Sequence, residues 1–182
     1  FGDIERLLGQ DVGTEDRGMP VAGDHTVGGQ PILAGTPFEA FLVKNGIDQT
    51  SIEGVGDSPY LEDVPVRRVS LHSPKTAIPV LWWRSVGNTH TAFAMESMID
   101  ELAFAAGKDP LAYRLALLAK KPRFAAALQL AAEKAGWGSA PPAGHARGLA
   151  VHESFGSIIA EVAEVSVEDG QIRVHQVTCA VD

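Results

Sequence analysis

The sequence predicts an α+β fold in which a helical layer packs on mainly antiparallel strands. Three observations predict it. Apolar residues recur at helical spacing through three consecutive segments between residues 89 and 136. The apolar spacing changes to two between residues 158 and 181. Asp169 and Gly170 divide that region, and an Asp-Gly pair is typical of a two-residue hairpin turn.

The first half of the chain is predicted to contain few regular elements. Residues 1–28 are rich in glycine and are read as a separate, poorly placed segment, mostly loop. Thr36, Pro37 and Glu39 predict a helix start, with Thr36 as the cap and Glu39 completing a capping box. A polar connector is expected over residues 47–65. Residues 66–73 and 77–83 are expected to be extended.

Three helices are expected in the middle of the chain. The first runs from about residue 89 to 106, and its inward stripe comprises Ala92, Met95, Ile99, Leu102 and Ala106. The second begins at Asp109-Pro110, because proline suits the first helical position. The third begins at Lys121-Pro122 and ends near Gly136, with Phe124, Ala127, Leu128 and Ala131 inward.

The last part of the chain is predicted to form strands. Residues 138–148 read as a loop and residues 149–153 as a short strand. Residues 158–167 and 172–181 pair antiparallel, with Val165 and Val174 facing inward. The strand that ends at Asp182 would offer a free edge, so a homodimer formed through this edge is one possible assembly.

Composition excludes several classes of protein. The 182 residues carry 15 basic and 23 acidic side chains, a net charge of −8, which argues against a surface that binds nucleic acid. One cysteine excludes an internal disulfide framework. No apolar run is long enough to span a membrane. No secretory signal is visible at Phe1, and both a cytoplasmic and a periplasmic location stay open.

The best candidate for a functional site is the turn around Arg84. It lies between an extended run and a helix, and Gly87 can take backbone angles closed to other residues. Asn88 or Thr89 can cap the helix, whose first amides would be unpaired. Together with the arginine, these amides would bind an anion or a polarised oxygen. The alternative is that Arg84 pairs with a surface carboxylate and the preceding tryptophans belong to the core.

Other chemically active residues form no convincing site. The six histidines lack metal-ligand spacing, and no metal site is predicted. His152, Glu153 and Ser154 include the residue types of a hydrolase, but neighbours on a strand point to opposite faces. Cys179 lies among apolar residues and is expected to be buried and inert.

Several motifs resemble the molybdenum-binding large subunits of the xanthine oxidase family. The likeness is strongest to the branch that includes the isoquinoline 1-oxidoreductase beta subunit and aldehyde dehydrogenase subunits. It rests on residues 80–87 (Val-Leu-Trp-Trp-Arg-Ser-Val-Gly), 92–103, 106–111, 131–138, 146–156, 160–165 and 179–182, and on residues 32–38 and 52–60. It covers residues 26–182, and residues 29–182 are expected to form a partial domain of this subunit.

The resemblance implies a function. Family members hold molybdopterin cytosine dinucleotide with molybdenum, use a small [2Fe–2S] subunit as partner, and oxidise an N-heterocycle or an aldehyde. Arg84 falls on the turn beside the metal and substrate, and is the implied catalytic residue. Ser85, Val86 and Gly87 of the same turn, with Ser154 and Gly156, are the implied cofactor-binding residues. Glu96 is expected on the solvated side of its helix, or bracing the Arg84 turn.

The resemblance also has a gap. Family large subunits are several times longer, and neither their glycine-rich cofactor segments nor their glutamate base is found here. The chain alone is therefore expected to bind no cofactor. It is read as part of a larger oxidoreductase; the alternative is a truncated, non-catalytic relative that serves as a structural or interaction domain.

Overall fold

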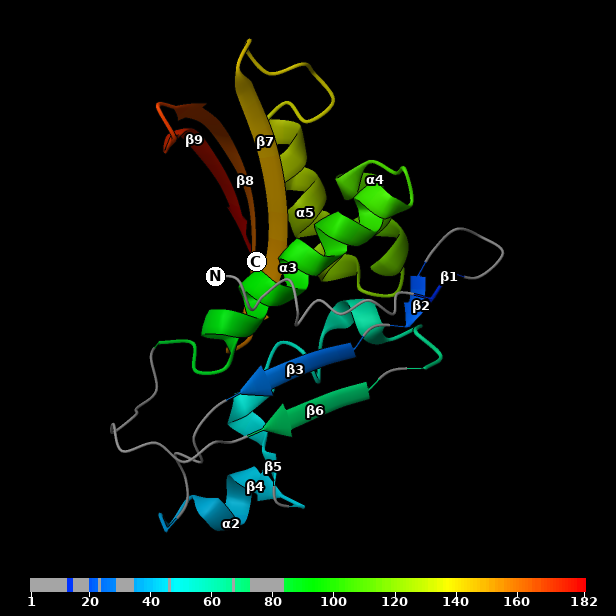
Figure 1. Ribbon diagram of the computed structural model, residues 1–182, viewed down its shortest axis with the longest axis vertical. Coiled ribbons are helices and arrows are strands. Elements are labelled where there is room, and N and C mark those ends of the chain that lie inside the picture. The colour runs from blue at the N-terminus through cyan, green and yellow to red at the C-terminus, as the bar shows by residue number, and fades with distance from the viewer. Residues whose placement is uncertain are drawn as a thin grey trace. The chain divides into compact units, whose positions relative to one another are not determined.

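The computed structural model describes residues 13–14, 20–22, 24–28, 35–45, 47–66, 68–72 and 84–182 (Figure 1). The chain divides into two compact units, residues 1–106 and residues 107–182. The extended run predicted over residues 77–83 lies outside the described residues. No helix in the described parts is long and apolar enough to cross a membrane.

The first unit contains short strands in pairs. They are β1 (Gly13–Thr14), β2 (Pro20–Ala22), β3 (Asp24–Gly28), β4 (Val43–Lys44), β5 (Ile47–Asp48) and β6 (Arg68–His72). β1 with β2 and β4 with β5 are antiparallel, whereas β3 and β6 are parallel. β3 lies in the glycine-rich segment expected to be loop. Its partner is distant in sequence, so local composition gives no sign of the pairing.

The helix predicted to begin at Thr36 is only one turn long. α2 spans Glu39–Leu42, has no side-chain cap, and leads directly into β4. Glu39 does not complete a capping box; its Oε2 accepts the N–H of Gly35 at 2.8 Å. The side chain thus stabilises the preceding turn.

The segment predicted as a polar connector is part of the buried structure of the first unit. It contains two 3-10 turns, η1 (Gln49–Ser51) and η2 (Pro59–Leu61). Val55 and Tyr60 are only 1% and 3% exposed. Its glycines and acids mark turns, and the few apolar residues between them are enough to fill a core.

The long helix of the first unit is α3 (Asn88–Ala105), close to the predicted bounds. Its buried side chains are Thr91, Met95, Glu96, Ile99 and Ala103. The stripe is therefore rotated from the predicted one. Glu96 is buried, and the expectation that it lies on the solvated side is wrong.

The second unit combines two helices with a three-stranded antiparallel sheet. The helices are α4 (Pro110–Leu117) and α5 (Pro122–Lys134). The strands are β7 (His145–Ser154), β8 (Ser157–Glu168) and β9 (Gln171–Val181), in the order β7-β8-β9. Asp109 caps α4 by accepting the N–H of Ala112 at 2.9 Å. β7 begins at His145, earlier than predicted, because residues 145–148 pair with β8.

One face of this sheet packs on α5, which contacts all three strands (Figure 1). Ala127, Leu128 and Ala131 of the helix are buried, as predicted. The sheet contributes buried side chains from β7, β8 and β9, namely Leu149, Val151, Ile158, Ala160, Val162 and Ala180. This layer of helix on sheet is the core of the second unit.

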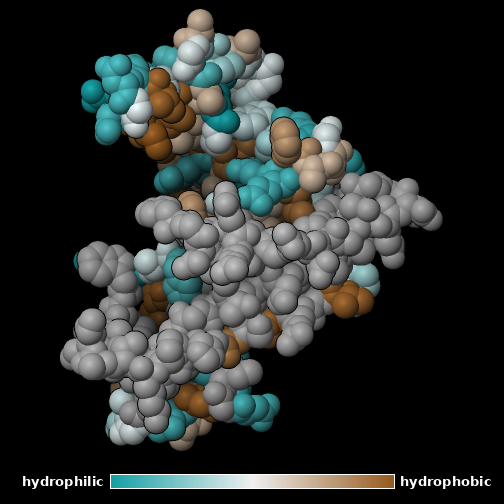
Figure 2. Space-filling view, viewed as in Figure 1, coloured by the Kyte–Doolittle hydropathy of each residue, from teal (hydrophilic) through white to brown (hydrophobic). Residues whose placement is uncertain are grey.

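The other face of the sheet is apolar and exposed. Figure 2 shows hydrophobic surface over β8 and β9. Val174 is 61% exposed and Cys179 is also exposed, so the predictions that they lie inward or buried are wrong. Both faces of β9 carry apolar side chains, and alternation alone could not indicate which one meets the helix. The large exposed side chains are Ile159, Val167, Ile172, Val174, Val177 and Val181.

Candidate functional site

Arg84, Ser85, Val86 and Gly87 form the turn that leads into α3. Ser85 and Val86 have φ angles of 65° and 51°, in the left-handed region. Such a conformation costs a non-glycine residue about 1–3 kcal/mol, and it is most unusual for a β-branched side chain. Strained backbone of this kind concentrates at functional sites. Arg84 itself is exposed, at the open side of the strained turn.

Hydrogen bonds within the chain hold the strained turn. The N–H of Asn88 donates to the carbonyl of Ser85 at 2.9 Å, and that of Thr89 donates to the carbonyl of Val86 at 3.3 Å. The hydroxyl of Thr89 donates to the carbonyl of Arg84. The first amides of α3 are therefore engaged, and Thr89 binds the turn in place of capping the helix.

Gly87 serves a different purpose from the predicted one. Its φ and ψ are −61° and −35°, angles that any residue adopts. Glycine is required because a Cβ at this position would lie 2.2 Å from the carbonyl oxygen of Thr50. The loop that carries Thr50 thus approaches the backbone of the turn directly.

Glu53 of the same loop contacts the turn as well. Its carboxylate accepts a hydrogen bond from the N–H of Gly87. Burial raises the pKa of the Glu53 carboxyl above its ordinary value, and nearby Asp57 and Asp48 raise this pKa further, while the bond from Gly87 lowers it. The position predicted for a bound anion at the start of α3 is therefore taken by a carboxylate of the chain itself.

The guanidinium of Arg84 is the group left to meet a ligand. It makes no ion pair with another of the described residues. A guanidinium stays protonated, so it can stabilise an anion or a growing negative charge but cannot act as a base. Of the two open interpretations, the contacts within the described residues give no support to a surface ion pair.

Ser154 and Gly156 lie in the second unit, at the turn between β7 and β8. Phe155 and Gly156 have φ angles of 53° and 85°, as a two-residue hairpin loop requires. The N–H of Gly156 donates to Oε1 of Glu153 at 2.7 Å. The Oγ of Ser154 is buried and has no hydrogen-bond partner. These two predicted residues are brought together, apart from the Arg84 turn along the chain.

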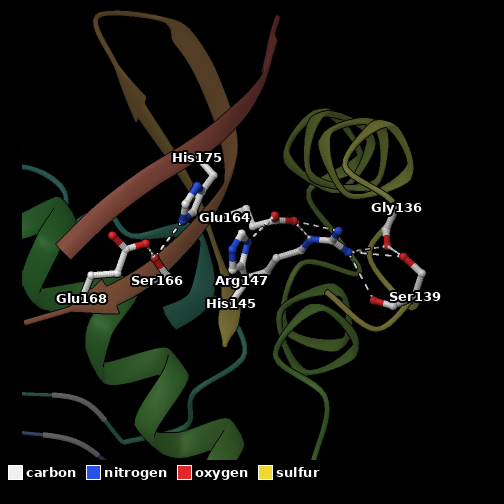
Figure 3. Close-up of polar contacts among 8 residues, drawn as sticks. All are labelled: Gly136, Ser139, His145, Arg147, Glu164, Ser166, Glu168 and His175. Carbon is white, nitrogen blue, oxygen red and sulfur yellow. Dashed lines mark hydrogen bonds and ion pairs between the residues drawn. The ribbon is translucent and has the colours of Figure 1, made fainter. Parts of the chain in front are cut away.

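A polar cluster that sequence reasoning missed lies across the three strands of the second unit (Figure 3). The rings of His145 and His175 stack with their centroids 4.0 Å apart. Nδ1 of His145 lies 2.9 Å from Glu164, which also binds Arg147 at 2.8 Å. Nε2 of His175 lies 2.8 Å from the hydroxyl of Ser166. Alternation through residues 145–148 would have placed His145 and Arg147 on one face.

Glu164 is the electrostatic centre of this cluster. Hydrogen bonds from His145 and from Arg147 lower the pKa of the Glu164 carboxyl below its ordinary value, and their charges add to the effect. Arg147 also donates to the carbonyl of Gly136 at 3.0 Å. The cluster therefore ties the sheet to the end of α5.

Two further features bear on ligand binding. A shallow cavity of ≈ 580 Å³ lies between α4, α5 and the loop after α5, with walls that include Leu111, Leu115 and Trp137. None of the predicted site residues lines it. Among the described residues, no group of three or more His, Cys, Asp and Glu side chains is arranged to hold a metal ion.

Comparisons with known proteins give two significant matches. The chain is 34% identical over 125 residues to the beta subunit of isoquinoline 1-oxidoreductase from Brevundimonas diminuta, a match that covers 66% of this chain and 16% of the relative. It is 41% identical over 108 residues to a nicotinate dehydrogenase subunit from Pseudomonas putida, covering 57% and 9%. The chain thus spans a small part of each relative. No family model matches, and no solved structure is significantly similar.

Proposed function

Because the chain belongs to the xanthine oxidase family of molybdenum-binding subunits, we propose that it forms part of an oxidoreductase that hydroxylates an N-heterocycle. The names of both relatives support this substrate class, since isoquinoline and nicotinate each contain an aromatic ring with a nitrogen atom. Both relatives are named as subunits, which supports an assembly of several chains, and we include a small [2Fe–2S] subunit among the partners.

The observation that carries the proposal is the strained turn that presents Arg84. Ser85 and Val86 hold left-handed angles, and the exposed guanidinium stands beside them. When bound, the molybdenum cofactor supplies oxygen transfer and accepts two electrons. Attack on the ring carbon builds negative charge on the substrate nitrogen. A fixed guanidinium stabilises that charge more strongly in the transition state than in the ground state.

The residues implied as cofactor ligands fit a large anionic cofactor only in part. Arg84 and the Ser85 hydroxyl can offer donors, whereas the amides of Gly87 and Gly156 are engaged by Glu53 and Glu153. We therefore assign to Arg84 and Ser85 the contacts with an anionic oxygen, either of the cofactor or of a substrate carboxylate. Val86 and Gly87 fix the geometry of the turn, and Gly156 shapes the hairpin.

The test is the Arg84→Ala variant in the assembled oxidoreductase that contains this chain. Turnover of isoquinoline or nicotinate should fall by roughly 10²–10³, the effect of losing one charge-stabilising donor. The free energy of unfolding should change by less than about 1 kcal/mol, because Arg84 is exposed. Arg173→Ala, which removes another exposed arginine, is the matched control. Unchanged turnover with a large loss of stability would identify a structural arginine.

A second candidate function is a non-catalytic structural or interaction domain. The exposed apolar face of β8 and β9 favours it, because large contiguous apolar surfaces mark sites where other protein packs. The two candidates differ in the Arg84→Ala experiment, since only the catalytic one predicts a loss of turnover.

A further inference from the structure

We propose that Glu53 is the positioning residue of the Arg84 turn, and that its contacts with Gly87 and Thr91 keep the guanidinium of Arg84 aimed at the ligand. This inference rests on the proposed function, because it assigns the purpose of the turn. Glu53 itself is not placed against substrate or cofactor; it acts through the turn.

Three kinds of contact join Glu53 to the turn and to the first turn of α3. Its carboxylate accepts the N–H of Gly87. Its carbonyl oxygen accepts the hydroxyl of Thr91 at 2.6 Å, and the same hydroxyl lies 3.0 Å from the carbonyl of Gly87. Its Cβ and N atoms lie 3.2 and 3.3 Å from the position of a Cβ on Gly87. Backbone and side chain of Glu53 thus fix Gly87 together.

These contacts explain how the strain upstream persists. Ser85 and Val86 would relax to ordinary angles unless both ends of the turn were held, because strained conformations survive only where their surroundings determine them. The hydroxyl of Thr89 holds the end at Arg84, and Glu53 with Thr50 holds the end at Gly87. Release of Gly87 would let the chain rotate two residues away, where the guanidinium originates.

Glu53 also has the electrostatics of an adjustable contact. The start of α3 favours a negative group, yet Glu53 Oε2 is buried without a hydrogen-bond partner. Asp48 and Asp57 are the charged groups that act on it, and both oppose its ionisation. Its pKa is raised as a result, so the contact with Gly87 should weaken within a pH range above the ordinary range of a glutamate.

The first experiment uses the 182-residue chain and ¹⁵N–¹H NMR. In the wild type, the amide proton of Gly87 should shift with pH around a midpoint above 4.5, the ordinary value for the Glu53 carboxyl. In Glu53→Gln, whose amide oxygen can still accept the bond, the shift should be flat. Residual dipolar couplings should retain the left-handed angles of Ser85 and Val86 in Glu53→Gln and lose them in Glu53→Ala.

Glu101→Gln, a change at an exposed position of α3, is the control and should leave both signals as in the wild type. If Glu53→Ala keeps the angles of Ser85 and Val86, or if the Gly87 amide does not titrate in the wild type, the positioning role is overturned.

The second experiment measures kcat/KM for nicotinate or isoquinoline in the assembled oxidoreductase. Glu53→Ala should lower it by about 10²-fold, the effect of misplacing a charge-stabilising group, and Glu53→Gln should recover most of the loss. In the Arg84→Ala background, Glu53→Ala should add little, because the two residues act through one interaction. Additive losses would overturn the coupling. Full turnover in Arg84→Ala would refute the proposed function, whereas the NMR experiment judges the hold of Glu53 on the turn independently.

Discussion

Gly87 is a glycine because the loop at Thr50 leaves no room for a side chain. A Cβ would lie 2.2 Å from a carbonyl oxygen, which cannot move away as a flexible side chain does. Gly87→Ala should therefore reduce the free energy of unfolding by about 1–3 kcal/mol, the usual effect of overpacking. Gly56→Ala is the control, because its Cβ would meet only the end of the Ile52 side chain, at 3.3 Å. Equal melting temperatures for the two variants would contradict the close approach.

Glu164 should make the stability of the second unit depend on pH. Its pKa is lowered in the folded chain by His145 and Arg147. The stabilisation is therefore complete above the ordinary pKa of 4.5 and is lost as the pH falls through the lowered pKa. Melting temperatures of the wild type and Glu164→Gln should differ at neutral pH and converge in acid. Glu161→Gln, on the exposed face, is the control; a difference that grows in acid would show that this linkage is wrong.

Single residues were predictable where the chemistry is local. Arg84 was identified because a cation before a helix is visible in sequence, and Asp109 because the pair Asp-Pro is a typical helix start. Glu53 was not identified, although it lies within a recognised motif over residues 52–60. Its contact is with Gly87, far along the chain, and no periodicity connects the two.

At the level of elements, the hairpin between β8 and β9 depends on its turn. Asp169 and Gly170 have φ angles of 51° and 73°, which confirms the predicted Asp-Gly turn. Gly170→Val should cost about 1–3 kcal/mol, because a β-branched residue rarely adopts a positive φ. Gly148→Val is the control, since that glycine lies in β7 with open space around it. Thermal unfolding measures both, and an unchanged midpoint for Gly170→Val would contradict the turn type.

The two faces of the sheet should respond differently to truncation. Val162 is 2% exposed in the face that packs on α5, whereas Val174 is 61% exposed on the other face. Val162→Ala should cost about 2 kcal/mol or more, from lost burial and the cavity left behind. Val174→Ala should cost much less. Denaturant unfolding of both variants tests the orientation, and a larger effect at Val174 would reverse it.

The elements that sequence predicted well carry their signals locally. α4 and α5 follow Asp-Pro and Lys-Pro pairs, and the strands that flank Gly170 show regular alternation. β3 and the start of β7 were missed because only pairing with a distant strand makes them extended. The orientation of β9 was missed because both of its faces are apolar, so the helix and not the strand decides which face is buried.

For the whole molecule, the central claim is that this chain acts as part of a larger molybdenum-binding assembly. It spans 16% and 9% of the two relatives. Its single cysteine cannot hold an iron–sulfur cluster. The amides of Gly87 and Gly156 are engaged by glutamates of the chain. Arg84 can stabilise charge but cannot take a proton.

The most direct test is the molybdenum content of the purified chain after expression in a host that makes the cofactor, measured with and without its partner subunits. The 182 residues alone should contain far less than one molybdenum per chain and should not oxidise isoquinoline or nicotinate. The assembled oxidoreductase should contain the metal and show turnover that depends on Arg84. Stoichiometric molybdenum together with N-heterocycle oxidation by the isolated chain would contradict the account.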